Sequence, residues 1–292
     1  TIESDFIKDK ETFKGSFYGI NGKKVELKKE EDVKEVLEKI KGKQFKIDKV
    51  KKRERRRNPA KPFTTSSLQQ DAARKLNFRA RKTMMVAQQL YEGIDLGRKS
   101  GGITGLITYM RTDSTRISNN AIEEAKGYIT DHYGKEYLAK TKRNKQGEGV
   151  QDAHEAIRPT SVIRDPRSLK SVLTNDQFKL YKLIYERFLA SQMAPAVMDT
   201  MTVHLLNNDV EFRATGSKVK FPGFMKVYVE GTDEKKEEEK FLPDLEENKN
   251  VESKKMTPNQ HFTQPPPRYT EARLVATMEK KGIGRPSTYA PT

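Results

Sequence analysis

The sequence predicts an α+β, multi-domain fold in which a predominantly helical domain is inserted into a β-rich domain. Apolar runs with a period of two occupy the first 50 residues and return after Met198, while the segment between them has helical periodicity. Because strand patterns flank the helical block on both sides, we expect them to belong to one domain. The predicted segments are 1–66 (β-rich, first part), 67–193 (helical), 194–265 (β-rich, second part) and 266–292 (start of a further, truncated segment).

The first β-rich segment combines short strand patterns with one helix. Apolar runs predict strands at residues 13–20, 24–27 and 44–50, and Asn21-Gly22 is a typical hairpin turn. Residues 31–40 have the spacing of a short helix.

The helical block contains four predicted helices, at residues 67–76, 80–91, 118–132 and 174–190. Ser118 is the expected N-cap of the third helix, and Thr174 with Gln177 forms a capping box for the fourth. The fourth helix carries an apolar and aromatic stripe at helical spacing, which favours core packing over base stacking. Its members are Phe178, Tyr181, Ile184, Tyr185 and Phe188.

The second β-rich segment shows strand patterns at residues 198–206, 210–214 and 219–229, with a turn at residues 207–209. A further helix is expected to end at Gly282.

Composition favours a polyanionic partner. The chain has a net charge of +16 and a pI near 9.6, although a mean hydropathy of −0.87 is also typical of a well-solvated surface. No apolar run approaches the roughly 20 residues that span a bilayer, and no signal-peptide pattern is found. The chain contains no cysteine, which excludes disulfides and cysteine-ligated zinc and is compatible with the cytoplasm.

The most informative stretch is residues 105–115, which read GLITYMRTDST. Attack on a phosphodiester needs an oxygen nucleophile and a cation that offsets the charge of the phosphate oxygens. In an extended segment Tyr109 and Arg111 share one face, which Asp113 joins. On spacing alone, the alternative is an ordinary buried tyrosine on a strand that enters a polar loop.

Further motifs follow in order. Residues 151–160 read QDAHEAIRPT, residues 265–272 read PPPRYTEA, and residues 281–289 read KGIGRPSTY. With these motifs the chain resembles the bacterial type IA DNA topoisomerases of the topoisomerase I branch, over almost its whole length. Glu155 and Arg158 favour that branch over topoisomerase III, and reverse gyrases carry similar strings.

The resemblance implies roles for individual residues. Tyr109 matches the nucleophile that cleaves one DNA strand as a 5′-phosphotyrosine, and Arg111 matches the arginine that positions the scissile phosphate. The roles of His154 and Arg158, which match positions near the cleavage site, stay open. The residues expected to contact DNA are Arg111, Thr112, Asp113, Ser114, His154, Arg158 and Arg285.

The resemblance also implies an architecture and partners. In that family the β-rich domain is the hinge of a toroid, and the helical domain is an arch that carries the tyrosine. An N-terminal Toprim domain, which holds Mg²⁺, is not found here. Because the chain opens on Thr1 rather than methionine, we expect a central strand-gate fragment with no metal or cofactor site of its own. The expected partners are single-stranded or underwound DNA and the parent's Toprim domain, with no membrane, in the cytoplasm at the nucleoid.

The implied activity is ATP-independent relaxation of negatively supercoiled DNA by the full parent, whereas this fragment alone is expected to be inactive. Two other classes stay open: a non-catalytic single-stranded DNA-binding module, and another tyrosine-dependent strand transferase. The four histidines never fall as a close pair, which disfavours a relaxase. Seven of the nine residues 49–57 are Lys or Arg, a density that suits phosphate binding.

Overall fold

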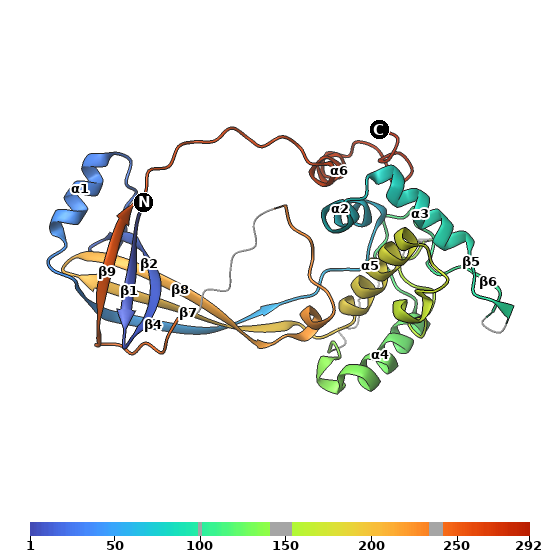
Figure 1. Cartoon of the computed structure of the whole chain (residues 1–292), viewed down its shortest axis with the longest axis horizontal. Helices are drawn as coiled ribbons and strands as arrows, with labels where there is room; N and C mark the ends of the chain where they lie inside the picture. Colours follow the sequence, from blue (N-terminus) through green and yellow to red (C-terminus); the bar gives the residue numbers. More distant parts are fainter. Residues whose placement is uncertain (99–100, 141–153, 234–241) are drawn as a thin grey trace, which may run out of the picture. The chain divides into compact units, whose positions relative to one another are not determined.

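The computed structural model describes residues 1–98, 101–140, 154–233 and 242–292 (Figure 1). These residues form two compact units, and each is built from three stretches of the chain. The first, which we call the barrel unit, comprises Thr1–Arg56, Val197–Phe221 and Lys236–Pro266. The second, the helical unit, comprises Arg57–Ala196, Pro222–Lys235 and Pro267–Thr292. The mixed α+β class is thus confirmed, while the four predicted domain ranges stay a prediction.

The barrel unit is one seven-stranded sheet with the order β1-β9-β4-β7-β8-β2-β3. Strand β1 also pairs antiparallel with β2, so the sheet closes on itself and leaves β3 beside β2. Closure removes the exposed edges that an open sheet presents. The strands are β1 (Ile2–Lys8), β2 (Glu11–Ile20), β3 (Lys23–Lys24), β4 (Gln44–Arg57), β7 (Ala196–Asn207), β8 (Val210–Phe221) and β9 (Asn250–Pro258), and helix α1 spans Glu30–Lys39.

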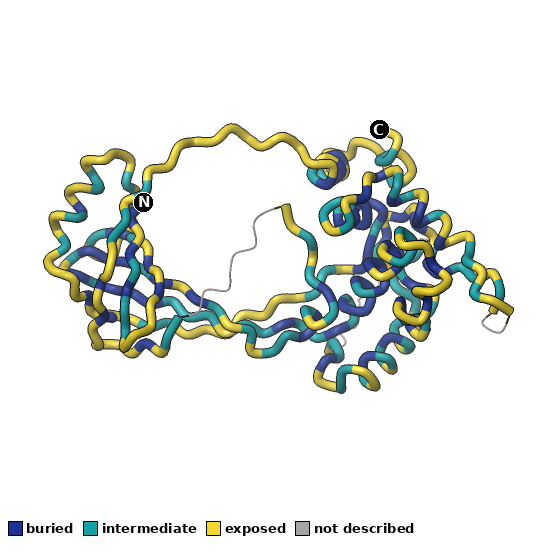
Figure 2. The backbone as a smooth tube through the Cα atoms, viewed as in Figure 1, coloured by how far each residue is buried: buried dark blue, intermediate teal, exposed yellow. Residues whose placement is uncertain are grey.

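Phenylalanines fill the centre of the barrel unit. The ring of Phe6, which is fully buried, lies 5.7 Å from Phe13, 5.1 Å from Phe45 and 5.9 Å from Phe212, measured between centroids. These residues come from four different strands. Along β1, β2 and β4 buried residues alternate with more exposed ones (Figure 2), because successive side chains of a strand point to opposite faces. Val36 of α1 packs into the same core.

Two turns of the barrel unit confirm their sequence patterns. Asn21 and Gly22 both have positive φ, at 53° and 72°, as the Asn-Gly hairpin signal predicts. The β7–β8 hairpin turns at Asn208, whose φ is 53°, and its ladder runs from the Asn207–Val210 pair to the Val197–Phe221 pair.

Four strand predictions need correction. The strand expected at residues 44–50 continues to Arg57, so the basic run of residues 49–57 is part of β4. The strand expected at residues 219–229 ends at Phe221, because Pro222 has no N–H to donate to a ladder and Gly223 turns the chain at φ 50°. The strand that contains Val210 is continuous to Phe221, rather than ending at Ala214. Strand β3 spans Lys23–Lys24, so only Lys24 of the expected residues 24–27 lies in it.

The helical unit confirms the four predicted helices and their caps. Ser118 Oγ accepts from the Ala121 amide, and the capping box of Thr174 and Gln177 is present. The described helices of this unit are α2 (Thr65–Leu76), α3 (Ala80–Glu92), α4 (Asn119–Tyr133), α5 (Asn175–Ser191) and α6 (Glu271–Lys280), with a small hairpin of β5 (Ile94–Asp95) and β6 (Ile103–Thr104). In the α5 stripe all members but the partly buried Phe178 are buried, which confirms core packing. No helix in the described ranges is both long and apolar enough to cross a membrane.

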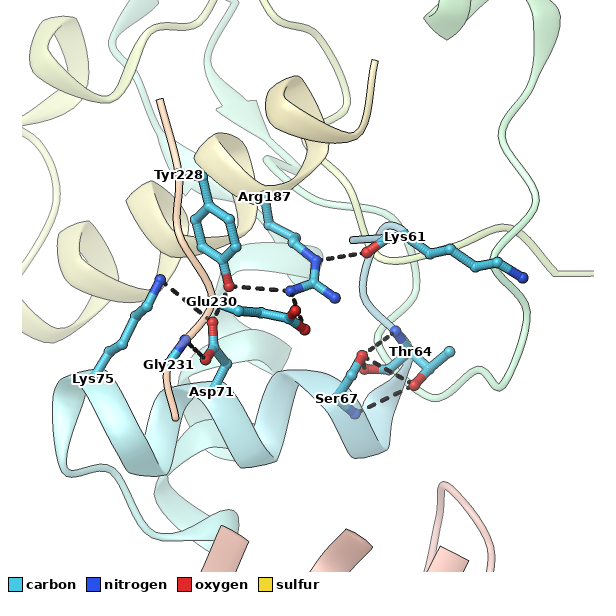
Figure 3. Close-up of polar contacts among 9 residues, drawn as sticks. All are labelled: Lys61, Thr64, Ser67, Asp71, Lys75, Arg187, Tyr228, Glu230 and Gly231. Carbon is cyan, nitrogen blue, oxygen red and sulfur yellow. Dashed lines mark hydrogen bonds and ion pairs between the residues drawn. The ribbon is translucent and has the colours of Figure 1, made fainter. Parts of the chain in front are cut away.

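A buried polar cluster joins α2 and α5 to the chain that follows β8 (Figure 3). Asp71 accepts hydrogen bonds from the Tyr228 hydroxyl and, at 2.9 Å, from the Gly231 amide. Arg187 donates to the Lys61 carbonyl at 2.5 Å, to the Tyr228 hydroxyl at 3.3 Å and to a Glu230 carboxylate oxygen at 2.8 Å. Asp71 and Arg187 can be buried with their charges because each side chain makes several hydrogen bonds.

Candidate active site

The stretch that carries Tyr109 begins where the chain leaves the β5–β6 hairpin and passes close to the end of α3. The Leu106 amide donates to the Leu90 carbonyl at 2.8 Å. A Cβ at Gly105 would lie only 2.7 Å from the Tyr91 carbonyl oxygen, so the close approach requires glycine at this position.

The first and second motifs pair with each other in short antiparallel fashion. The Thr108 amide donates to the Arg158 carbonyl, and the Thr160 amide to the Leu106 carbonyl, both at 2.9 Å. The Thr108 hydroxyl adds a bond to the Ala156 carbonyl at 2.7 Å. Residues 151–153 of the second motif lie outside the described residues. Two strings about 50 residues apart thus form one structural site.

Exposure alternates along the first motif. Tyr109, Arg111 and Asp113 are exposed, whereas Met110 and Thr112, between them, are buried. The alternation confirms that the first three share a face, and the alternative of a buried tyrosine is wrong, because Tyr109 is 37% exposed.

Tyr109 and Arg111 line an open cavity of about 480 Å³ with one face of helix α3. That face supplies Met84, Met85, Gln88 and Glu92. These α3 residues are not among the predicted site residues, although their spacing at positions 84, 88 and 92 places them on one side of a helix. Nothing in the sequence indicates that this side of α3 meets the Tyr109 segment.

The Tyr109 ring is held between two other rings. Tyr91 lies edge-on to it at 5.3 Å, and His154 of the second motif lies at 5.8 Å with an interplanar angle of 31°. The phenolic oxygen of Tyr109 forms no hydrogen bond with any described residue. The ring is therefore oriented by packing while its oxygen stays available.

Arg111 and Arg158 differ in their surroundings. Arg158 donates to Glu155 at 2.6 and 2.9 Å, to the Pro159 carbonyl at 2.9 Å and to Ser118 Oγ at 3.3 Å. Arg111 is exposed and has no carboxylate partner within the described ranges. Arg111 is free to bind an anion, whereas Arg158 already ties the second motif to the start of α4.

Thr112 and Ser114 are buried and shape the loop. Thr112 Oγ1 accepts from the Ser114 amide at 3.0 Å, and Ser114 Oγ accepts from the Arg116 amide at 3.2 Å. Thr65, at the start of α2, donates through its hydroxyl to the Met110 carbonyl at 2.7 Å. The predicted DNA contacts of Thr112 and Ser114 stay predictions, and their geometry favours a role in holding the loop.

The motif at residues 281–289 lies near the exposed end of the first motif, where Asp113 is. Arg285 is exposed, and its amide donates to Thr288 Oγ1 at 2.8 Å within a tight turn. Partial burial raises the pKa of Tyr289, and the charges of Glu279 and Asp113 raise it further. Asp113, which shares the exposed face of Tyr109 and Arg111, makes no hydrogen bond or ion pair in the part of the chain that the structure describes.

The described residues do not fit a metal site. They contain no group of three or more His, Cys, Asp or Glu side chains that could hold a metal ion.

Comparison with known proteins places these observations in a family. The sequence model of the family described as "DNA topoisomerase" matches residues 1–292. The structure of full-length topoisomerase I from Thermotoga maritima is similar, with a TM-score of 0.80 and 38% sequence identity. The match covers 99% of this chain and 45% of that one, so this chain spans under half the length of the Thermotoga protein. The chain therefore belongs to the DNA topoisomerase family.

Proposed function

We propose that this chain is the strand-gate part of an ATP-independent type IA DNA topoisomerase of the topoisomerase I branch, which relaxes negatively supercoiled DNA. Tyr109 is the proposed nucleophile, and Arg111 binds the scissile phosphate. The observation that carries the proposal is an exposed phenol with an unengaged oxygen, which lines one open cavity with an arginine that has no described carboxylate partner.

The proposed reaction exchanges one phosphoester for another. The Tyr109 phenolic oxygen attacks the phosphorus, a bond forms between them, and the bond to the DNA 3′-oxygen breaks. The phenol loses its proton, and the leaving 3′-oxygen gains one. Religation runs the same steps in reverse, and no ATP is needed because the phosphotyrosine conserves one phosphoester throughout.

The residues of the site have separate tasks in this proposal. Arg111 offsets the negative charge that builds up on the non-bridging oxygens, where a guanidinium can donate two parallel hydrogen bonds. His154 and Tyr91 limit the orientations of the Tyr109 ring by packing against it. Arg158 keeps the second motif in place through Glu155 and Ser118.

The remaining parts of the activity are proposed for a longer parent protein. We propose that a Toprim domain of that parent holds Mg²⁺ and serves the 3′-oxygen, so that this chain alone does not relax DNA. The proposed substrate is single-stranded or underwound DNA, and the proposed location is the bacterial cytoplasm at the nucleoid.

A mixing assay tests the proposal. This chain and a separately made Toprim-containing piece of the same parent are added, with Mg²⁺, to single-stranded DNA labelled at its 3′ end. We expect a labelled covalent protein–DNA adduct that Tyr109→Phe abolishes. Tyr133→Phe, which changes a partly exposed tyrosine at the end of α4, outside the family motifs, is the matched control and should retain the adduct.

The outcomes separate the candidate functions. An adduct of equal yield with Tyr109→Phe would remove the catalytic assignment. DNA binding by a folded pair without any adduct would favour a non-catalytic single-stranded DNA-binding module.

A further inference from the structure

The outer face of the barrel unit carries a second, smaller cavity of about 190 Å³, to which the basic run of residues 49–57 contributes. Three strands contribute to it. Thr202 and His204 of β7 alternate with Val203 and Leu205, which point into the barrel core, so the cavity lies on the opposite face of the sheet. The residues that line it are Lys51, Arg53, Thr200, Thr202, His204 and Arg213.

The charge of this lining is positive. Lys51 and Arg53 belong to the basic run of β4, and neither has a carboxylate partner among the residues that the structure describes. No carboxylate lines the cavity. The nearest carboxylate with contacts to the lining is Glu211, which accepts from His204 Nδ1 at 2.8 Å and from Arg213 Nε at 2.7 Å. The Glu211 charge is therefore shared with Arg213, while the charges of Lys51 and Arg53 are uncompensated.

His204 adds a polar atom without a partner. The residue is 8% exposed, and its Nε2 is buried with no hydrogen bond to any described group. A buried polar atom left without a partner is unfavourable, so such atoms are rare in native proteins. Nδ1 faces Glu211, so Nε2 is the ring atom left to pair with a ligand; in the form that carries a proton on each ring nitrogen, Nε2–H can donate to an anionic oxygen.

We propose that this cavity binds one phosphate group. Lys51 and Arg53 supply the charge, His204 Nε2 and the Thr202 hydroxyl supply donors, and Arg213 completes the wall. The Thr200 hydroxyl donates to the Arg53 carbonyl at 3.0 Å and so connects β7 to β4 beside the cavity. Its volume lies below the roughly 300–1,000 Å³ typical of pockets that enclose whole small molecules, so a single tetrahedral group fits better than a nucleotide. The group comes either from a DNA backbone or from free phosphate.

A neighbouring cavity shows why the assignment is specific. It is larger, at about 600 Å³, and shares Arg53 and Thr200 with the first. Its lining also includes Glu54, Asp199 and Asp244, whose negative charges oppose an anion. The smaller cavity alone combines uncompensated cations with an unpartnered donor site. The proposal does not depend on the role of Tyr109, which belongs to the helical unit.

The test begins with inorganic phosphate and the 292-residue chain. The chain has four histidines, so the ring ¹⁵N signals are few, and the signal lost in His204→Gln identifies His204. We expect this signal to shift in a saturable way as phosphate is added. In the double variant Lys51→Gln with Arg53→Gln, the phosphate concentration at half-saturation should rise about tenfold or more, because two charge-assisted contacts are lost.

The matched control removes the same charge from the same strand. Lys46 and Lys49 are exposed on β4 and do not line the cavity, so Lys46→Gln with Lys49→Gln should leave the phosphate response unchanged. Thermal unfolding of both double variants confirms that the barrel unit stays folded. Arg53→Gln alone provides a milder variant that should show a smaller loss of the same kind.

A second arm distinguishes the sources. Binding of a labelled single-stranded oligonucleotide is followed by anisotropy at several salt concentrations. If the backbone supplies the phosphate, the Lys51/Arg53 variant loses more affinity than the control, and the slope of log K against log salt falls by about 0.7 for one phosphate. If free phosphate is the ligand, only the ring signal responds. A folded protein with no saturable His204 shift and no excess loss of oligonucleotide affinity would overturn the site.

Discussion

Single residues determine whether a basic side chain is available to DNA. Arg111 and Arg158 lie in matched motifs and carry the same charge, yet only Arg158 is held by a carboxylate in the described ranges. The exposure of Tyr109, Arg111 and Asp113 follows from period-two spacing and was predictable. The flanking of Tyr109 by Tyr91 and His154 was not, because it depends on contacts between distant segments: Tyr91 comes from the end of α3, and His154 from the second motif.

This difference predicts the outcome of a conservative substitution. Arg111→Lys keeps the positive charge but removes the planar pair of donors, so we expect the rate of covalent adduct formation to fall about 10- to 100-fold. Arg81→Lys, at an exposed arginine of α3 outside the cavity, should leave the rate unchanged. Equal rates for the Arg111 variant and the wild type would show that a simple point charge suffices at this position.

At the scale of elements, the junction between α3 and the Tyr109 segment depends on one glycine. In Gly105→Ala the new Cβ would lie 2.7 Å from the Tyr91 carbonyl oxygen, a backbone atom that cannot rotate away. We expect a loss of about 1–3 kcal/mol in the free energy of unfolding and slower adduct formation, measured by denaturant unfolding and the mixing assay. Gly127→Ala in α4 is the control, since no atom lies within 4 Å and alanine favours a helix. If the two variants unfold alike, the close approach at Gly105 is not a constraint.

The polar cluster that joins α2 and α5 makes the free energy of unfolding depend on pH in the alkaline range. Burial raises the pKa of Tyr228 well above its usual value, and the charge of Asp71 raises it further. A tyrosine whose pKa is raised on folding contributes to the free energy of unfolding. That contribution is fully present below the unfolded pKa of about 10 and is lost as the pH rises from there toward the folded pKa. Burial lowers the pKa of Lys75, which acts in the opposite direction.

Tyr228→Phe isolates the contribution of the tyrosine. At pH 8 the variant should be less stable than the wild type by about 1–3 kcal/mol, because Asp71 loses a hydrogen-bond donor. Between pH 9.5 and about 11 the gap in melting temperature should narrow, since only the wild type must ionise Tyr228 on unfolding. A gap that stays constant over this range would contradict the raised pKa of Tyr228.

For the whole molecule, local patterns were predictable and long-range pairing was not. The four helices of the central block follow from periodicity and capping residues, which are local. The sequence patterns did not predict strand β9, because it has few apolar residues. It pairs antiparallel with β1, from the other end of the chain, and the Ser4 and Ser253 hydroxyls of these two strands lie 2.8 Å apart. Closure of the barrel rests on that pairing, which no local pattern encodes.

The net charge of +16 is also a property of the whole molecule, and it predicts that the affinity of the chain for DNA depends on salt, whether or not a strand is cleaved. If Lys and Arg side chains replace counterions along single-stranded DNA, log K falls linearly with log salt, by about 0.7 for each phosphate neutralised. Tyr109→Phe removes no charge, so its slope should equal that of the wild type while its adduct disappears. Anisotropy at 50 to 200 mM salt measures the slope for both proteins. Binding that did not change with salt would instead indicate that the positive charge is a solvated surface, and that recognition rests on base stacking or neutral hydrogen bonds.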